Sequence, residues 1–449
     1  MKYGVIVYQE TKNIGDDIQS YAAARLLPHV DYYIEREQMD VFCPKENEPV
    51  HVIMNGWFMY NKLAWPVSPC INPLYLSMHF WEKDALEIHG DFLDGLGGED
   101  LKAHEPIGCR DSETKQLLEQ HGISAWLSGC LTLTLDPVGV VQKEDYICLT
   151  DVSEEVESYL RKYYPQTVFR CIAHEAVGMV SPEDSWQERF ANVETLLRTY
   201  QNAKAVITTR LHCALPCLAL GTPVLLLFDE QIVEQGRFDG LVTLTHHCTT
   251  QELLKGESRF DLAQPPANPS DYLEKRENLL RVVAQFLQKC DSDQDILKKR
   301  FESFNGDWVR RAQWKNEQIV SLQQKAISRW NQTHEEMEHL EEGRRWLEGQ
   351  YQAQKNQLDT LYHELAEQKR WSIELEQGKD WLESQCRSQS DQLDKLDNAL
   401  AEQKHWSQQL EKDKNWLENQ WTSSEKKYAN LLVQYERIPS WIRAIFKKR

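Results

Sequence analysis

Short apolar runs alternate with longer segments of helical periodicity over roughly the first 290 residues of the chain. The predicted strands are residues 3–8, 52–54, 107–109, 146–150, 168–173, 205–209 and 224–228, and the predicted helices are residues 17–27, 113–120, 154–164, 185–200 and 214–220. This alternation is typical of parallel sheets joined by crossover helices. A break near residues 136–139 divides the pattern. We therefore predict an α/β fold of two Rossmann-like domains, at residues 1–137 and 138–290.

The pattern changes from about Trp308, where glycine and proline almost vanish and Gln, Glu, Lys and Leu dominate. The sequence Trp346-Leu347-Glu348 recurs at 381–383 and 416–418, a repeat of 35 residues, which is five heptads. The heptads of this repeat predict a seam of apolar side chains along the helix. Polar side chains interrupt this seam at Gln354, Gln368, Gln389 and Gln403. After a linker at residues 291–307, we predict a coiled coil at 308–437 that makes the protein a homo-oligomer. A single solvated helix is the alternative.

Residues 438–449 form a third kind of segment. Ile438, Trp441, Ile442, Ile445 and Phe446 recur at helical spacing, and the segment carries basic side chains without an acidic one. Such a basic amphipathic tail is typical of a helix that lies in the interface of an anionic membrane. A frayed basic tail after the coiled coil is the alternative.

Composition narrows the classes of protein. The formal net charge of the 449 residues is −19, so nucleic acid is not an expected partner. The 11 cysteines occur singly, which favours reduced thiols over disulfides. Cys213 and Cys217 are four residues apart, but no second pair of metal ligands accompanies them, so we expect no metal site. The first residues hold too short an apolar stretch for a signal peptide, so none is expected, and no apolar run of about 18 residues occurs. We expect a cytoplasmic protein, with the tail on the inner face of the plasma membrane.

The most informative chemistry follows the predicted strand at 205–209. Arg210 and His212 stand where this strand passes into a helix of small residues. Ligands of open α/β sheets bind at the carboxyl ends of strands, where Arg grips carboxylates or phosphates and His exchanges protons. The pair predicts a binding site for a small anion. The alternative is that both residues only shape the start of the helix.

Three motifs together resemble the polysaccharide pyruvyl transferase family over about residues 1–290. They are Asn13-Ile14-Gly15-Asp16, Arg110-Asp111-Ser112 and Thr208-Thr209-Arg210-Leu211-His212, followed by Leu220–Val224 and Arg237–Leu241. The resemblance implies two domains similar to glycosyltransferases of the GT-B type. It also implies transfer of the enolpyruvyl group of phosphoenolpyruvate to sugar hydroxyls of a bacterial surface polysaccharide or exopolysaccharide, which leaves a pyruvate ketal. Phosphoenolpyruvate would be a co-substrate, and no cofactor is expected.

The same resemblance suggests roles for individual residues. It implies that Arg210 and Arg110 bind the donor and that His212 is the proton donor. Without the family pattern, we would interpret Arg110 as one member of a structural ion pair with a neighbouring acidic residue. Further substrate contacts are expected from Asn13, Gly15, Asp16, Asn55, Trp57, Leu211 and Arg237. The acceptor would be a glycan, free or lipid-linked.

Three readings from the residues stay open beside this one. Asn13 and Asp16 follow the first predicted strand, where they would orient an acceptor hydroxyl, and the alternative is that Asp16 or Asp17 only caps the next helix. Tyr60, Trp65 and Tyr75 lie in a predicted loop up to His79, where their rings would face sugars or simply pack. The competing functions are a GT-B glycosyltransferase that binds a nucleotide sugar near Glu230 and Glu234, and a non-catalytic coiled-coil scaffold.

Overall fold

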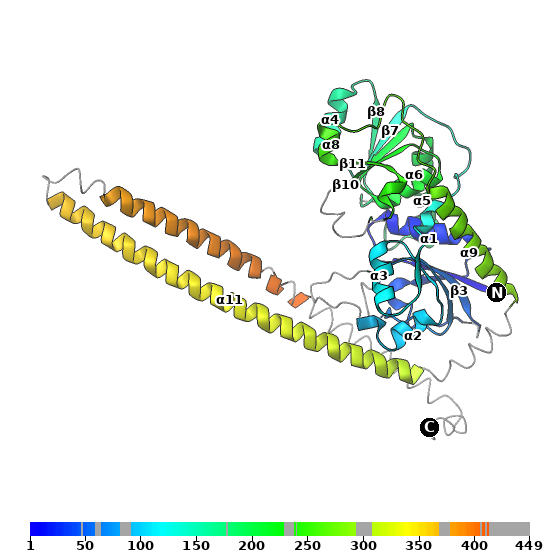
Figure 1. The fold of residues 1–449 in the computed structure, drawn as a ribbon, viewed down its shortest axis with the longest axis horizontal. Helices are drawn as coiled ribbons and strands as arrows, with labels where there is room; N and C mark the ends of the chain where they lie inside the picture. The colour runs from blue at the N-terminus through cyan, green and yellow to red at the C-terminus, as the bar shows by residue number, and fades with distance from the viewer. Residues whose placement is uncertain are drawn as a thin grey trace, which may run out of the picture. The chain divides into compact units, whose positions relative to one another are not determined.

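The computed structural model describes residues 1–45, 48–58, 64–80, 91–176, 178–228, 238, 240–292, 308–367, 378–404, 406–408 and 411–412. The chain forms two compact units. One comprises Met1–Lys83 and His89–Arg311, and the other comprises Asp84–Ile88 and Ala312–Arg449. The first unit holds both sheets, and the second is helical where it is described (Figure 1).

The first sheet has six parallel strands in the order β2-β1-β3-β4-β5-β6. They are β1 (Lys2–Val7), β2 (Tyr32–Glu35), β3 (Val50–Phe58), β4 (Ile71–Phe80), β5 (Ile107–Cys109) and β6 (Ala125–Leu127). The helices along this part of the chain are α1 (Ile14–Leu26), α2 (Leu96–Lys102) and α3 (Ser112–Gln120). Because all strands are parallel, their carboxyl ends share one edge.

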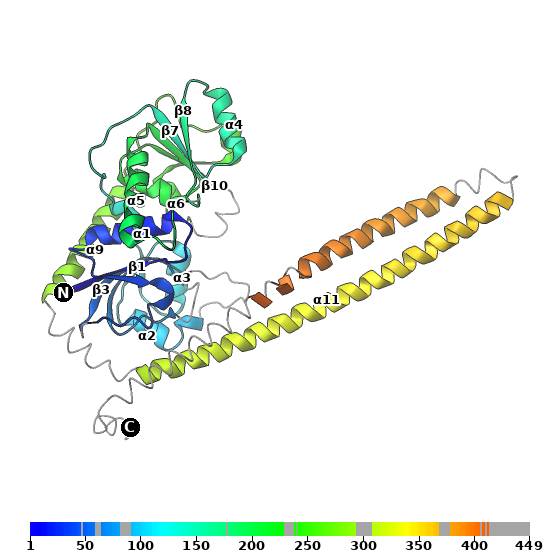
Figure 2. The ribbon, with the colours of Figure 1, turned by 180° about the vertical axis from the view of Figure 1, so that it is seen from behind.

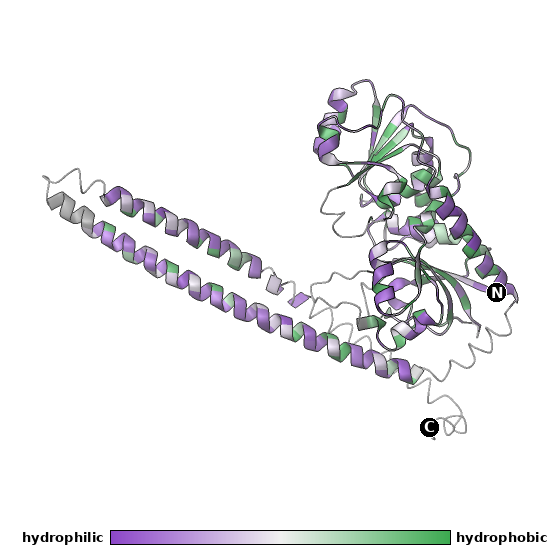
Figure 3. Cartoon of the chain, viewed as in Figure 1, coloured by the Kyte–Doolittle hydropathy of each residue, from purple (hydrophilic) through white to green (hydrophobic). Residues whose placement is uncertain are grey.

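The second sheet has five parallel strands in the order β11-β10-β9-β7-β8. They are β7 (Tyr146–Thr150), β8 (Val168–Ile172), β9 (Ala205–Thr208), β10 (Val224–Phe228) and β11 (His246–Thr249). Its helices are α4 (Glu154–Tyr163), α5 (Trp186–Asn202), α6 (Leu211–Ala219) and α8 (Thr250–Leu254), and α9 (Tyr272–Ser292) follows. In Figure 3 the strands are coloured mainly as hydrophobic, as expected of parallel strands covered on both faces.

Helix α1 lies between the two sheets (Figures 1 and 2). It contacts β1 and β3 of the first sheet, and α5 and α6 of the second. Its Ile14 and Ile18 are fully buried, in one hydrophobic cluster with Leu197 of α5 and Leu215 of α6. The amino end of α1 is thereby fixed beside the carboxyl edge of the second sheet.

The sequence predicted three of the six strands of the first sheet and four of the five of the second, and it missed β2, β4, β6 and β11. The segment expected as a long loop up to His79 contains the ten-residue strand β4 instead. Trp65 and Tyr75, considered as faces for sugar rings, are buried and pack on each other with ring centroids 5.6 Å apart. Of the two readings, packing therefore holds for Trp65 and Tyr75, and Tyr60 lies outside the described residues.

The second unit contains most of the long helix α11 (Trp308–Glu367) and the helical residues 378–404. The two run antiparallel, side by side (Figures 1 and 2), with Arg344 Nε 3.5 Å from Asp397 Oδ1. Side chains that are buried or half-buried recur at spacings of three and four in both, at Leu340, Arg344, Leu347, Tyr351, Gln354 and Leu358, and at Leu382, Cys386, Gln389, Leu393, Leu396 and Leu400. In each of the two helical segments the buried and half-buried side chains thus follow one face.

Two predictions concern a membrane: the absence of a membrane-spanning helix and the basic tail. Within the part of the chain that the structure describes, no helix combines the length and apolarity needed to cross a bilayer. The basic tail at 438–449 lies outside the described residues, as does the last part of the predicted coiled coil.

Candidate functional site

The amino end of α1 carries the first sequence motif. The Asn13 side chain accepts a hydrogen bond from the Gly15 N–H at 2.9 Å and so caps the helix. Asp16 accepts from Thr11 Oγ1 at 2.6 Å and from the indole of Trp57 at 3.2 Å. The first motif is therefore joined to the end of β3 by direct hydrogen bonds.

The carboxyl edge of the second sheet carries the Arg-Leu-His motif together with groups from β7 and β8. Arg210 follows β9, Asp151 follows β7, and His174 follows β8. The Asp151 carboxylate accepts from Arg210 Nε at 2.8 Å and from the His174 backbone N–H at 3.2 Å. Glu175 accepts from Arg210 Nη2 at 3.0 Å. The three strands are neighbours in the order β9-β7-β8, which brings these residues together.

His212 lies against the amino end of α1. A Cβ at Gly15 would be 3.3 Å from the Cβ of His212 and 3.5 Å from Nδ1 of His174. The His174 carbonyl oxygen accepts from the Ile14 N–H at 3.1 Å, and its Nε2 lies 2.8 Å from the Tyr200 hydroxyl. Both histidines are buried, and glycine at position 15 allows the helix to approach them this closely.

Arg110 stands at the carboxyl edge of the first sheet, directly after β5. Its side chain is 1% exposed, and its Nε lies 3.7 Å from the carboxylate of Asp111. Asp111 caps α3 by accepting from Thr114 N at 2.9 Å, and it lies 2.7 Å from His79 Nδ1. Burial alone would raise the pKa of the Asp111 carboxyl group. The contacts with His79 and Arg110 lower this pKa by more than burial raises it, so it lies below its ordinary value.

Aromatic rings and a second arginine lie near Arg110. The Arg36 guanidinium stacks over Trp57, 3.9 Å from the ring centroid, and over Tyr8 at 4.7 Å. Gly56 has φ +121°, and a Cβ there would collide with the Tyr8 hydroxyl. Burial raises the pKa of Tyr8 far above its ordinary value, while the charges of Arg36 and Arg110 lower it. Arg110 thus adds to the positive potential at Tyr8.

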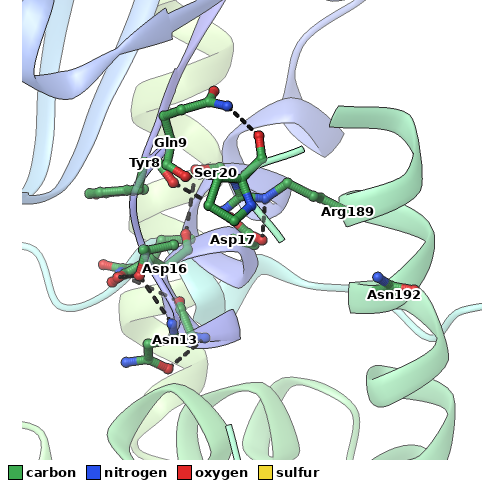
Figure 4. A network of polar contacts seen from close by, with 12 residues as sticks. Tyr8, Gln9, Asn13, Asp16, Asp17, Ser20, Arg189 and Asn192 are labelled. Atoms are coloured by element: carbon green, nitrogen blue, oxygen red, sulfur yellow. Dashed lines mark hydrogen bonds and ion pairs between the residues drawn. The ribbon is translucent and has the colours of Figure 1, made fainter. Parts of the chain in front are cut away.

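A buried ion pair clamps α1 to α5 beside this site (Figure 4). Arg189 donates to Asp17 through Nε at 2.8 Å and Nη2 at 2.6 Å, and Nη2 also donates to the Tyr8 carbonyl at 3.0 Å. Both side chains are fully buried. Burial raises the pKa of Asp17 to about 6, although the guanidinium beside it acts to lower it. The ion pair ties α1, whose amino end carries the first motif, to α5, the helix that precedes β9 and the Arg-Leu-His motif.

Residues 13–227 match the family model described as polysaccharide pyruvyl transferase. These residues belong to the polysaccharide pyruvyl transferase family. The match covers Asn13, Arg110, Arg210 and His212, so all three motifs fall within the pyruvyl transferase region, and the family indicates a transferase.

Two further comparisons add less. No curated protein matches the chain. The crystal structure of an uncharacterized protein from Klebsiella pneumoniae subsp. pneumoniae NTUH-K2044 is similar at 13% identity and a TM-score of 0.32, covering 56% of this chain and 93% of that one.

The structure connects many of the predicted site residues of the pyruvyl transferase region. Asn13, Gly15 and His212 meet at the amino end of α1, while Asp16, Trp57 and Asn55 join it to β3, since Asn55 Nδ2 donates to the Gln19 carbonyl at 3.0 Å. Leu211 is the first residue of α6 and is buried. Arg237, and Glu230 and Glu234 of the nucleotide-sugar alternative, lie outside the described residues.

Sequence analysis did not single out three members of the site. They are Asp151, His174 and Glu175, which contact Arg210 or lie beside His212. Their signal was their position, because Asp151 and His174 directly follow strands that the sequence did predict, and Glu175 comes next after His174. Among the residues that the structure describes, no three His, Cys, Asp or Glu side chains form a group that would hold a metal ion.

Proposed function

We propose that this chain transfers the pyruvyl group of phosphoenolpyruvate to hydroxyls of a surface polysaccharide or exopolysaccharide sugar and forms a pyruvate ketal. The observation that carries the proposal is the placement of Arg210 and His212. Both lie at the carboxyl edge of the second sheet, and His212 also lies against the amino end of α1, which Asn13 caps. This is the edge at which α/β folds bind anionic ligands.

The donor needs two cationic groups, because phosphoenolpyruvate carries a carboxylate and a phosphate on one small enol. Arg210 offers a guanidinium that is 36% exposed, and Arg110 is a buried arginine at the corresponding edge of the first sheet. Planar guanidinium groups bind such anions bidentately. Arg110 and Arg210 are proposed to supply the positive charge for the donor without a metal or organic cofactor.

The chemistry begins at the methylene carbon of the donor. A proton from His212 adds to this carbon and makes C2 electrophilic, and a sugar hydroxyl attacks C2 and gives up its proton. The C2–O bond to phosphate then breaks, phosphate leaves with the electron pair, and a second sugar hydroxyl closes the ketal and releases its proton. A histidine is suited to the first step because its ordinary pKa lies near neutrality.

The acceptor is proposed to be a free or lipid-linked glycan that lies near the amino end of α1. Asn13, Asp16, Asn55 and Trp57 offer amide, carboxylate and indole groups there, joined by the hydrogen bonds described above. Polar groups held in place in this way orient a sugar hydroxyl. Arg237 and the backbone of Leu211 complete the proposed set of substrate contacts.

The two sheets are proposed to be the two Rossmann-like halves of a GT-B-like arrangement. The proposed boundary lies at residues 137–138, and the second half ends near residue 290. The parallel order of both sheets and the position of α1 between them support this division.

The helical second unit is proposed to make the protein a homo-oligomer. The antiparallel segments pair within the chain, but Trp346, Trp381 and Trp406 remain exposed on them. Exposed tryptophans are common in protein interfaces. Residues 438–449 would then place several basic tails together at the inner face of the plasma membrane, where the avidity of combined weak anchors favours binding.

Donor binding tests the proposal. Titration calorimetry with phosphoenolpyruvate should show binding to the wild-type protein and a loss of affinity of about 10-fold or more in Arg210→Lys, because lysine keeps the charge but lacks the bidentate fork. Arg170→Lys is the matched control, because Arg170 is an exposed arginine of the same sheet paired with Glu144. Equal affinity in the wild type and Arg210→Ala would contradict the assignment.

A further inference from the structure

Arg210 contacts two carboxylates that differ in their surroundings. Asp151 accepts from Nε at 2.8 Å, and Glu175 accepts from Nη2 at 3.0 Å. The Asp151 side chain is 14% exposed, whereas that of Glu175 is 54% exposed. The guanidinium is therefore held on one side by a mostly buried group and on another by a group in solvent.

Asp151 is anchored by its own backbone as well as by its side chain. It has φ +52°, a left-handed conformation that is unusual for a residue other than glycine. Its N–H donates to the Ile172 carbonyl at 3.0 Å, its carbonyl accepts from Thr209 Oγ1 at 2.8 Å, and its carboxylate also accepts from the His174 N–H. Residues held by several contacts in such a rare backbone conformation cluster at functional sites, which fits Asp151 as the residue that positions Arg210.

Glu175 has a different relation to the same arginine. Its carboxylate occupies Nη2, one of the two terminal nitrogens that an entering carboxylate or phosphate would need for an end-on bidentate contact. Because the pair is largely exposed, it is weak and exchanges with little cost. Asp151 leaves the terminal nitrogens available, since it holds Nε.

We propose that the two carboxylates have opposite effects on donor binding. Asp151 positions Arg210, and Glu175 is an intramolecular stand-in for the anionic group of the donor, which displaces it on binding. This inference rests on the proposed function, because the displacing anion is the carboxylate or phosphate of phosphoenolpyruvate. Glu175 thereby lowers the affinity for anions and favours a donor that offers more than one anionic group.

Two isosteric substitutions separate these roles. Asp151→Asn should weaken phosphoenolpyruvate binding by about 10-fold, because Arg210 loses its charged anchor and regains rotamer freedom. Glu175→Gln should tighten binding by about 2- to 5-fold, because the competing charge is removed. In steady-state assays, Glu175→Gln should lower the KM for phosphoenolpyruvate.

The experiment is titration calorimetry of the full-length protein with phosphoenolpyruvate and, separately, with inorganic phosphate. Glu144→Gln is the matched control, because it removes an exposed carboxylate paired with a different arginine of the same sheet. Thermal melting of each variant checks that the fold is intact. Asp151→Glu should bind phosphoenolpyruvate more tightly than Asp151→Asn, because it keeps a negative charge beside Arg210.

Opposite shifts for Asp151→Asn and Glu175→Gln, with no shift for Glu144→Gln, would support the inference. Weaker or unchanged binding in Glu175→Gln would overturn it while leaving the proposed function intact. A wild-type protein that binds neither phosphoenolpyruvate nor phosphate would overturn both.

Discussion

Replacing His212 with glutamine is expected to lower turnover of phosphoenolpyruvate by roughly 10²–10⁴-fold with little change in donor binding. Glutamine fills a similar space and forms hydrogen bonds, but it cannot deliver a proton to the methylene carbon. His212 is buried at the start of α6, beside Gly15 and His174, so the substitution changes a group held inside the site. The measurement is phosphate release at saturating donor, with the donor affinity of the same variant measured by calorimetry.

His247→Gln is the matched control, because His247 is an exposed histidine of the same sheet and its Nδ1 lies 2.9 Å from the Thr245 carbonyl. Its turnover should equal that of the wild type. Near-normal turnover in His212→Gln would remove the acid role from His212, and His174 would be the next residue to test.

Replacing Arg189 with methionine is expected to lower the free energy of unfolding by about 3–5 kcal/mol, because it leaves the Asp17 carboxylate buried without its partner. The guanidinium also donates to the Tyr8 carbonyl, which would lose that hydrogen bond. Urea unfolding followed by circular dichroism measures the change. Arg198→Met is the control, since its ion pair with Glu194 is exposed and should contribute less than about 1 kcal/mol.

The loss in Arg189→Met should depend on pH with a defined sign. The pKa of Asp17 is already raised in the folded protein, to about 6, and removal of the guanidinium raises it further. A carboxyl group with a raised folded pKa keeps a proton that the unfolded chain releases, so its destabilising effect grows as the pH rises above its unfolded pKa of about 4. The difference between variant and wild type should therefore shrink from pH 7 to pH 5, and a constant difference would contradict this explanation.

Hydrophobic patterning was sufficient for most of the second sheet and failed in part of the first. The predicted strands at 107–109, 146–150 and 224–228 coincide with β5, β7 and β10. Strand β4 escaped notice because it contains Pro73 and bends at Ser77, which has φ +60°, so it lacks a regular apolar run. Its pairing with β3, which shifts register between Met54 and Gly56, is a tertiary feature.

The site shows a similar limit. Arg210 and His212 could be found because they stand together after one strand, and the family motif marked them. Asp151 and His174 follow strands that are separate in sequence, and the order β9-β7-β8 that makes them neighbours is a property of the sheet. In the same way, the heptads predicted helices, but they could not show that residues 378–404 lie beside α11 of the same chain.

Incubation of the purified full-length protein with phosphoenolpyruvate and a panel of candidate glycans tests the pyruvyl transfer itself. The predicted result is phosphate release that depends on the acceptor, with a mass increase of that acceptor by one pyruvate less one water. Arg210→Ala and His212→Gln should lack both signals. No phosphate release with any acceptor, together with consumption of a nucleotide sugar by the same protein, would contradict pyruvyl transfer and favour a glycosyltransferase.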